Sequence, residues 1–176
     1  MHLRSPKGKI LGCIVSAKGI DPNPNKARTI LNMKVPKNIK DAQKLTGRLA
    51  ALNRFISKSV ERSLPIFQAL KGTKKDFTWG PSQQYAFEEI KSYLSKPNTL
   101  TTPTLGDEFL LYVSATENAV LVEEQENEYS KNQVPVYFVS ETLSGSKIYY
   151  SEIEKIAYAV LTAARKLKHN FQAHKI

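Results

Sequence analysis

Three basic residues at four-residue spacing are the strongest candidates for chemistry in this chain. Lys40, Lys44 and Arg48 lie at i, i+4 and i+8, so on an α-helix they form a row along one face. A rise of about 1.5 Å per residue separates neighbours by roughly 6 Å, comparable with the phosphate spacing along one nucleic-acid strand. Gly47 and Ala51 lie on the same side, where small side chains let a backbone approach closely. The pattern predicts phosphate contacts that position a duplex without reading its sequence, and the alternative is a solvated helix face.

The distribution of charge supports a polyanionic partner. Residues 1–75 hold 17 Lys and Arg against Asp21, Asp41 and Glu61, a net charge of +14. Residues 76–176 carry a net charge of −4, which gives +10 for the whole chain. A segment with so few acids cannot neutralise itself, so we expect it to bind nucleic acid.

Other constellations for catalysis or metal binding are weaker. Nucleotidyl transfer needs clustered carboxylates that hold two metal ions, and the four aspartates of this chain include no adjacent pair. His169 and His174 are five residues apart and do not share a helix face well. No phosphate-binding glycine loop is present. We interpret the four acids Glu123, Glu124, Glu126 and Glu128 as a solvated hairpin turn and not as a cation site.

The cationic row needs a helix to position it, and the apolar pattern predicts one from about Ile39 to Ile56. Its buried stripe is expected to comprise Ala42, Leu45, Leu49, Leu52 and Ile56. Four further elements are expected around it. A strand is expected at 9–16, followed by a turn at Lys18-Gly19. A helix capped by Asn23 is expected to start at Pro24 and reach about Met33. Helices are also expected at about 58–70, interrupted at Pro65, and from Pro81 to about Leu94.

A β-rich pattern follows Pro97. Apolar runs at 109–113, 119–122 and 134–139 are separated by polar turns and predict three strands. A long helix is expected at about 151–173. Its apolar side is expected to carry Ile153, Ala157, Val160, Leu161, Ala164 and Leu167.

Composition describes a folded chain with a hydrophobic fraction of 41%. The single Cys13 excludes an internal disulfide framework. No apolar run approaches the roughly 20 residues needed to span a bilayer, and the N-terminus lacks the apolar stretch of a secretory signal. We therefore expect an intracellular protein, cytoplasmic or nuclear, without a membrane partner.

Several segments, in order along nearly the whole chain, resemble gypsy-type LTR-retrotransposon Pol polyproteins. Ile10-Leu11-Gly12, Val15-Ser16, Gly19-Ile20 and Pro24-x-Lys26 are similar to the end of the reverse transcriptase palm. The segment 44–57 resembles the first thumb helix. Leu64-Pro65-x-Phe67-x-x-Leu70 and Phe77-x-Trp79, followed by Phe87 and Ile90-Lys91, resemble the thumb-to-connection region. Segment 135–140, Tyr150 and Glu154-Lys155 resemble the opening of the tethered RNase H-like domain.

The resemblance implies roles for individual residues. Leu11 and Gly12 match the primer-grip hairpin, which holds the primer end near the polymerase site. The helix with Lys40, Lys44, Gly47, Arg48 and Arg54 matches the thumb, which packs against the template–primer duplex. Trp79 and Phe87 are expected in the core of the connection and not as a stacking platform.

The chain departs from the family at the positions where the resemblance implies RNase H catalysis. The run Val113-Ser114-Ala115-Thr116 matches Thr-Asp-Ala-Ser, so Ser114 stands in place of the metal-binding Asp. Glu154-Lys155-Ile156-Ala157 matches Glu-x-Glu-Leu, so Ile156 stands in place of the catalytic Glu. A hydroxyl cannot replace a carboxylate's charge toward a hard cation. We therefore predict no catalytic residue, no metal ligand and no cofactor in this chain, although the parent family uses Mg²⁺.

The sequence thus predicts an α+β fold, with a helical thumb/connection unit followed by a truncated RNase H-like βββα unit. The expected divisions are a palm end at 1–22, a helical unit at 23–97 and an RNase H-like unit at 98–176. The resemblance implies a parent protein that carries out RNA-directed DNA synthesis with RNase H activity, and this fragment is expected to retain at most sequence-independent binding of duplex or hybrid. Its expected partners are nucleic acid and the remainder of the Pol polyprotein. The alternatives are a structural or interaction remnant with an exposed sheet edge, or a decayed reading frame.

Overall fold

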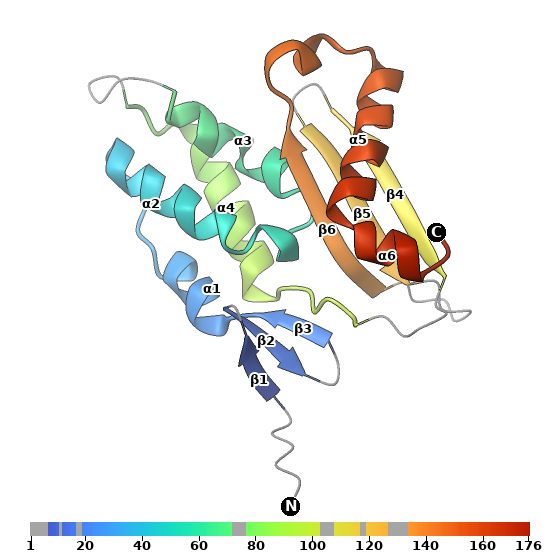
Figure 1. Cartoon of the computed structure of the whole chain (residues 1–176). Helices are drawn as coiled ribbons and strands as arrows, with labels where there is room; N and C mark the ends of the chain where they lie inside the picture. Colours follow the sequence, from blue (N-terminus) through green and yellow to red (C-terminus); the bar gives the residue numbers. More distant parts are fainter. Residues whose placement is uncertain are drawn as a thin grey trace, which may run out of the picture.

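A computed structural model of the chain describes residues 7–10, 12–16, 19–71, 77–102, 108–116, 119–126 and 134–176. Two antiparallel sheets flank a group of helices (Figure 1). In the described part, no helix is both long and apolar enough to cross a membrane.

The N-terminal sheet contains three short strands, β1 (Lys7–Ile10), β2 (Cys13–Ser16) and β3 (Gly19–Pro22). They pair antiparallel in the order β1-β2-β3. The expected single strand at 9–16 is therefore wrong. Gly12 has a φ of +79°, a left-handed conformation that glycine adopts without strain, and the chain reverses there. Of the predicted turn at Lys18-Gly19, Lys18 lies outside the described residues and Gly19 begins β3.

Four helices follow, α1 (Pro24–Leu31), α2 (Ile39–Ala50), α3 (Ser59–Ala69) and α4 (Pro81–Ser95). The predicted cap of α1 is confirmed, because the Asn23 side chain accepts a 3.0 Å hydrogen bond from the Asn25 N–H. The predicted start of α4 at Pro81 is also confirmed.

The second helix is shorter than predicted. It ends at Ala50, and the chain continues into a 3₁₀ turn, η1 (Asn53–Phe55), instead of reaching Ile56 as α-helix. The Leu52 N–H bonds to the Leu49 carbonyl at 2.9 Å, a three-residue spacing that tightens the end of the helix. Leu52, Phe55 and Ile56 are still fully buried, so the expected apolar stripe is correct although its backbone is not one helix.

The third helix passes through Pro65 without the predicted interruption. A proline inside a helix loses one backbone hydrogen bond, and packing offsets that loss here. Ile66 is fully buried, and Arg62 forms an ion pair with Glu89 of α4. The side-chain amide of Gln83 donates to the Pro65 carbonyl at 3.2 Å, which also ties α3 to α4.

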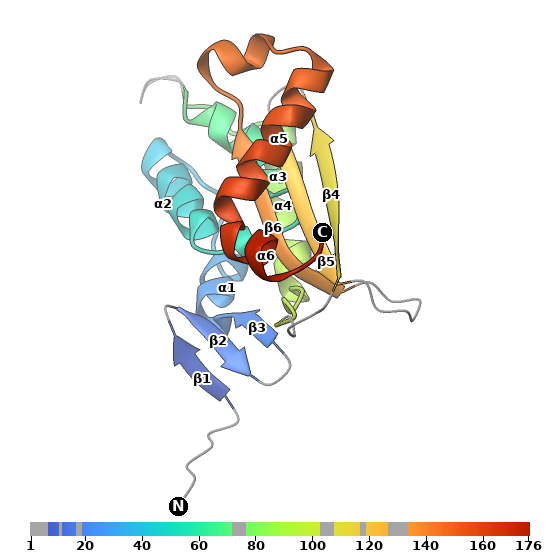
Figure 2. The same cartoon turned by 45° about the vertical axis from the view of Figure 1, so that its right-hand side comes forward.

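The second sheet is an antiparallel meander of β4 (Phe109–Ala115), β5 (Ala119–Glu126) and β6 (Val134–Thr142). A 3₁₀ turn, η2 (Gly145–Tyr149), leads to α5 (Glu152–Lys166) and the short α6 (Lys168–Ala173), which cover one face of the sheet (Figure 2). The helix predicted at 151–173 is thus two helices that break at Leu167.

Strand β6 joins the helical group to the sheet. Phe138 belongs to the core formed with Leu45, Phe55 and Ile90, whereas Val139 packs with Ala159 and Ala163 of α5. Consecutive residues of a strand point to opposite faces, so β6 carries helices on both sides. The predicted unit of three strands and a helix is confirmed in its order.

The predicted apolar side of α5 is largely wrong. Its buried face consists of Ala159, Thr162 and Ala163, which are small enough for close approach to the sheet. Ile153 is 76% exposed, and Ile156, Val160 and Leu161 are exposed as well. Of the predicted set, only Leu167 is fully buried. The larger apolar side chains of this helix therefore lie on its solvent-exposed side.

The last residues return to the sheet beside β4. Lys175 pairs with Glu108 in parallel, and the Phe109 N–H donates to the Lys175 carbonyl at 2.9 Å. The Lys175 ammonium also lies 2.7 Å from the Glu108 carboxylate. The chain at Lys175 thus runs alongside β4 in the same direction.

Candidate nucleic-acid interface

Helix α2 buries one face and exposes its cations on the other. Its buried residues are Ala42, Leu45 and Leu49. Lys40, Lys44, Gly47 and Arg48 are all exposed. The helix begins at Asn38, whose side chain accepts a 3.0 Å hydrogen bond from the Asp41 N–H. The structure therefore brings these four predicted site residues together on one exposed helical surface, which we call the α2 surface.

Two cations of the α2 surface, Arg48 and Lys44, differ in how firmly they are held. The Arg48 guanidinium donates to the Thr29 carbonyl at 3.1 Å and to the Met33 sulfur at 3.4 Å, so it is anchored against the end of α1. Lys44 lies 3.9 Å from Asp41, a distance typical of a weak surface pair. Most of the positive charge on this face thus remains available to a ligand.

Gly47 leaves an open position between the cations. A Cβ placed on it would meet no atom within 4 Å outside its own neighbourhood. Its role is therefore not to relieve crowding inside the protein. The open space is on the solvent side of the helix.

Arg54 is exposed on η1, just beyond the end of α2, and lines a groove between η1 and β6. Leu11, the first of the two primer-grip-like residues, lies outside the described residues. Gly12 occupies the turn between β1 and β2, next to the Lys26 ammonium of α1. Lys26 belongs to one of the motifs that resemble the palm end, but only the fold brings it beside Gly12.

Trp79 and Phe87 pack inside the helical group, as predicted. Phe87 is 2% exposed, and its ring meets the Trp79 ring edge-on at a centroid distance of 6.0 Å. The Trp79 indole N–H donates to the Gln84 side chain at 3.1 Å. Because the indole is engaged on both sides, it is unsuited to stacking on a base.

The positions that match RNase H carboxylates are exposed. Ser114 lies on β4, and Ile156 lies on α5 with 40% of its surface exposed. Among the described residues, no group of three or more His, Cys, Asp or Glu side chains could hold a metal ion. His174 packs its ring against Phe109 at a centroid distance of 4.4 Å. The predicted acidic turn is wrong for Glu123, Glu124 and Glu126, which lie in strand β5 and pair with β4, while Glu128 lies outside the described residues.

A network of side-chain hydrogen bonds and an ion pair connects α5 to β6. The Lys147 ammonium donates to the Tyr158 hydroxyl at 2.7 Å, and that hydroxyl donates to Glu141 at 2.6 Å. Lys166 lies 2.9 Å from the other Glu141 oxygen. The hydrogen bond from Tyr158, followed by that from Lys166, lowers the pKa of Glu141. The hydrogen bond with Tyr158 raises the pKa of Lys147.

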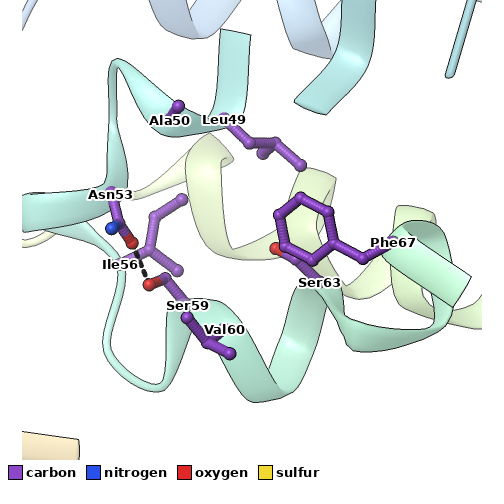
Figure 3. A pocket seen from close by; sticks show the side chains of 8 residues that line it. All are labelled: Leu49, Ala50, Asn53, Ile56, Ser59, Val60, Ser63 and Phe67. Atoms are coloured by element: carbon purple, nitrogen blue, oxygen red, sulfur yellow. Dashed lines mark hydrogen bonds between the residues drawn. The ribbon is translucent and has the colours of Figure 1, made fainter. Parts of the chain in front are cut away.

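A small pocket between α2, η1 and α3 is a poor ligand site (Figure 3). It is lined mainly by apolar side chains such as Leu49, Ile56 and Phe67. Its volume is about 90 Å³, below the roughly 300–1,000 Å³ of small-molecule sites. Two of its three polar residues, Asn53 and Ser59, bond to each other.

Sequence comparisons place the chain among retroelement proteins. Residues 79–176 match the family described as "RNase H-like domain found in reverse transcriptase". The Pol polyprotein from transposon 297 of Drosophila melanogaster is 29% identical over 166 residues, which cover 93% of this chain and 15% of that protein. The transposon Tf2-3 polyprotein of Schizosaccharomyces pombe is 27% identical over 165 residues, which cover 94% of this chain and 12% of that protein. The chain thus spans less than a sixth of these relatives.

Structural comparisons give the same fold. The foamy viral protease-reverse transcriptase in complex with double-stranded DNA matches with a TM-score of 0.75 and 16% identity, over 93% of this chain and 28% of that one. Its complex with an RNA/DNA hybrid matches with a TM-score of 0.74 and 17% identity, over 92% and 22%. The likeness confirms the predicted α+β class. The chain belongs to the RNase H-like domain family found in reverse transcriptases, and its relatives are Pol polyproteins of retrotransposons.

Proposed function

We propose that the chain binds duplex or hybrid nucleic acid through the α2 surface, without reading its sequence. The observation that carries the proposal is the exposed row of Lys40, Lys44 and Arg48 on one face of α2. Ammonium and guanidinium groups at about 6 Å steps match the phosphate backbone, and phosphate contacts carry no sequence information. The foamy viral proteins that share the fold were solved with double-stranded DNA and with an RNA/DNA hybrid.

The parent of this segment is, in our proposal, a gypsy-type Pol polyprotein that carries out RNA-directed DNA synthesis and RNase H cleavage inside the cell. Within it, residues 1–22 would end the palm, 23–97 would form the thumb and connection, and 98–176 would belong to the RNase H-like domain. Primer-grip contacts would come from Leu11 and Gly12, and thumb contacts would include Arg54.

This chain alone is proposed to be catalytically inactive. Ser114 and Ile156 stand where the family resemblance implies a metal-binding Asp and a catalytic Glu, and neither side chain can hold Mg²⁺ as a carboxylate does. The expected result is that purified chain with Mg²⁺ leaves the RNA strand of a labelled hybrid intact. Cleavage that persists after repurification and disappears with EDTA would overturn this part of the proposal.

The experiment that tests binding is titration of residues 1–176 against a labelled RNA–DNA hybrid across a salt series, with a single strand of the same length for comparison. The logarithm of the association constant should fall linearly with the logarithm of salt concentration, because bound cations displace counterions from phosphates. The hybrid should bind more tightly than the single strand. Negligible binding even at low salt would refute the proposed function.

A second candidate function is packing against the remainder of a Pol polyprotein. Two observations favour it: Lys175 pairs beside β4 in parallel, and Ile153, Ile156 and Val160 form an exposed apolar face on α5. The relatives are more than six times longer than the matched segment, so they contain further polypeptide that could supply such a partner. A strand edge next to apolar surface suits a strand and a helix from another part of the protein.

Sedimentation at high salt without nucleic acid tests this candidate. If the apolar face of α5 normally packs against another part of the protein, the isolated chain should associate as its concentration rises. The double substitution Ile153→Lys with Val160→Lys should abolish the association. A monomer at every concentration would count against it.

A further inference from the structure

Strand β4 has an edge that is only partly paired within the described part of the chain. It is an outer strand of the second sheet, with β5 on one side. The Phe109 N–H points away from β5, because it donates to the Lys175 carbonyl beside the strand. Backbone groups of an antiparallel strand alternate in direction, so Leu111, Val113 and Ala115 also direct their N–H and C=O groups outward. Among the described residues, no backbone group pairs with this outward set.

Helix α5 presents apolar side chains on the side of this edge. Its Tyr158 side chain reaches the other way, to Glu141 on β6. Successive residues of an α-helix are turned by about 100°, so Ile156 and Val160 lie on the side of α5 opposite Tyr158. Ile156 and Val160 are 40% and 41% exposed, and Ile153, one turn earlier, is 76% exposed. These three residues form an apolar stripe along the β4 side of α5, which we call the α5 stripe.

Helix α5 runs in the opposite direction to β4. Its first turn lies near the end of β4, because Glu152 lines one recess together with Thr116. The chain after α5 returns to the beginning of β4, where Lys175 pairs with Glu108. The edge is therefore occupied at its beginning, and the outward set lies in the remaining part, 111–115.

These directions suit a second copy of the same chain. If two β4 strands pair antiparallel about a two-fold axis at Val113, Leu111 of each copy lies opposite Ala115 of the other. Strands in a sheet are about 4.8 Å apart, and α5 lies over β4 and β5, so the two α5 helices come to lie about 10 Å apart. Packed helices are separated by about 8–10 Å, so the two α5 stripes meet across the axis.

The charges at the two ends of α5 are complementary in the same arrangement. The first turn carries Glu152 and Glu154, and Lys155 offsets one of these charges. The opposite end carries Arg165 in the last turn of α5 and Lys168 at the start of α6. An antiparallel pair of α5 helices brings the acidic end of each copy toward the basic end of the other.

We infer that two copies of this chain join through the outward backbone groups of Leu111, Val113 and Ala115, with their α5 stripes packed against each other. The interface is isologous, because the same patch serves on both copies. The inference goes beyond nucleic-acid binding. It also assigns the apolar face of the second candidate function to a second copy of the chain and not to the remainder of a Pol polyprotein.

The test compares two substitutions at the proposed axis, Val113→Pro and Val113→Ala. Proline removes the outward N–H, which the second copy needs and β5 does not use, so an edge strand tolerates it. Alanine removes side-chain contacts with α5 but keeps the N–H, so it is the matched control. Sedimentation at high salt without nucleic acid measures the mass across a concentration series, and circular dichroism checks that each variant is folded.

The wild-type mass should rise from that of one chain to that of two. Two copies of Val113→Pro lose two hydrogen bonds across the axis, so the dissociation constant of the dimer should rise at least about tenfold. Val113→Ala should weaken the dimer much less.

A crosslinking measurement decides the geometry even if Val113→Pro does not fold. In a chain with Cys13→Ser, Ile156→Cys places one thiol in each α5 stripe, and a short thiol-reactive crosslinker should join two chains there. The matched control is Gln68→Cys in the same background, an exposed position on α3 that should give no covalent dimer.

The outcomes separate this inference from the proposed functions. A monomer at every concentration overturns it, while the separate titration with a hybrid still decides nucleic-acid binding. If Ile153→Lys with Val160→Lys abolishes association but folded Val113→Pro associates like Val113→Ala, the apolar face is covered without the strand edge, and the inference is overturned. Equal crosslinking at positions 156 and 68 overturns it as well.

Discussion

The Tyr158 hydroxyl on α5 donates a 2.6 Å hydrogen bond to the Glu141 carboxylate on β6. Lys166, about two turns further along α5, approaches the other oxygen of the same carboxylate. Glu141 thus receives two donors from a single helix. The carboxylate helps to set how α5 lies on the sheet, and with it the position of Lys166 in the groove between η1 and β6.

This relationship predicts an acid-sensitive contact. The pKa of Glu141 lies below its ordinary value of 4.5 in the folded chain, so the carboxylate stabilises the fold above that value. The contribution is lost as the pH falls through the lowered pKa. Glu141→Gln should be less stable than wild type near pH 7, and the difference should shrink in acid. Urea unfolding at several pH values measures it, and Glu152→Gln, which removes an exposed acid of α5, is the charge-matched control.

Charge reversal on the α2 surface should weaken binding and flatten its salt dependence. Lys40→Glu with Lys44→Glu removes two phosphate contacts, so the slope of log association constant against log salt should drop by about 2 for duplex DNA. Arg48 is better tested by Arg48→Lys, because its contacts with Thr29 and Met33 also support α1. Binding that is unchanged by the double reversal would refute a role for these lysines.

Substitution of Gly47 should separate stability from binding. Gly47→Ala fills open space on a helix, so it should raise the free energy of unfolding by about 0.5–1 kcal/mol. Gly47→Gln should be similarly well folded but should weaken duplex binding, because its side chain projects between the cations. Chemical denaturation and the duplex titration check the two effects, and equal affinity in all three proteins would contradict a close backbone approach at this position.

Gly19→Ala should damage the N-terminal sheet. Gly19 has a φ of +130°, and a Cβ on it would collide with the Leu100 carbonyl oxygen. That carbonyl accepts the Ile20 N–H at 2.7 Å, so the collision disrupts the link between β3 and the segment after α4. We expect a loss of about 2–4 kcal/mol in the free energy of unfolding. Gly8→Ala, where a Cβ meets nothing within 4 Å, is the matched control.

The orientation of α5 predicts that its large apolar residues tolerate substitution better than its small ones. Ile153→Lys changes an exposed side chain and should alter the free energy of unfolding by no more than about 0.5 kcal/mol. Ala163→Leu adds volume at a fully buried position against the sheet and should cost about 1–3 kcal/mol. Thermal or urea unfolding measures the change in the free energy of unfolding for both variants. The opposite ranking would mean that the helix packs through its larger apolar residues.

Local signals predicted much of the helical architecture. Asn23 followed by Pro24, and Pro81 after Gly80, mark helix starts through capping and fixed φ, and both lie where expected. The exposed cations of α2 followed directly from the position of its apolar stripe. The hairpin at Gly12 was missed as a strand boundary, because the apolar residues around it form one uninterrupted run and only the glycine signals the reversal.

Tertiary packing, and not the periodicity of apolar residues, determines which side of α5 is buried. Apolar residues surround much of α5, so spacing alone favoured the side with the larger ones, whereas the sheet accepts the side with Ala159 and Ala163 because small residues allow a closer approach. The groove between η1 and β6 could not be predicted from the sequence for a similar reason. Lys26, Arg54 and Lys166 are separated by long stretches of sequence, and only the meeting of α1, η1 and α5 around β6 brings them together.

The packing of β6 has a consequence for how this protein could assemble. It packs against η1 and α3, and its Pro135 carbonyl accepts a hydrogen bond from the Thr101 N–H. Among the strands that the structure describes in this sheet, β4 is the other edge, and the chain at Lys175 pairs beside its start. If two copies joined edge to edge at β4, each would present its helix-packed β6 at the outside, and growth through this sheet would stop at a pair.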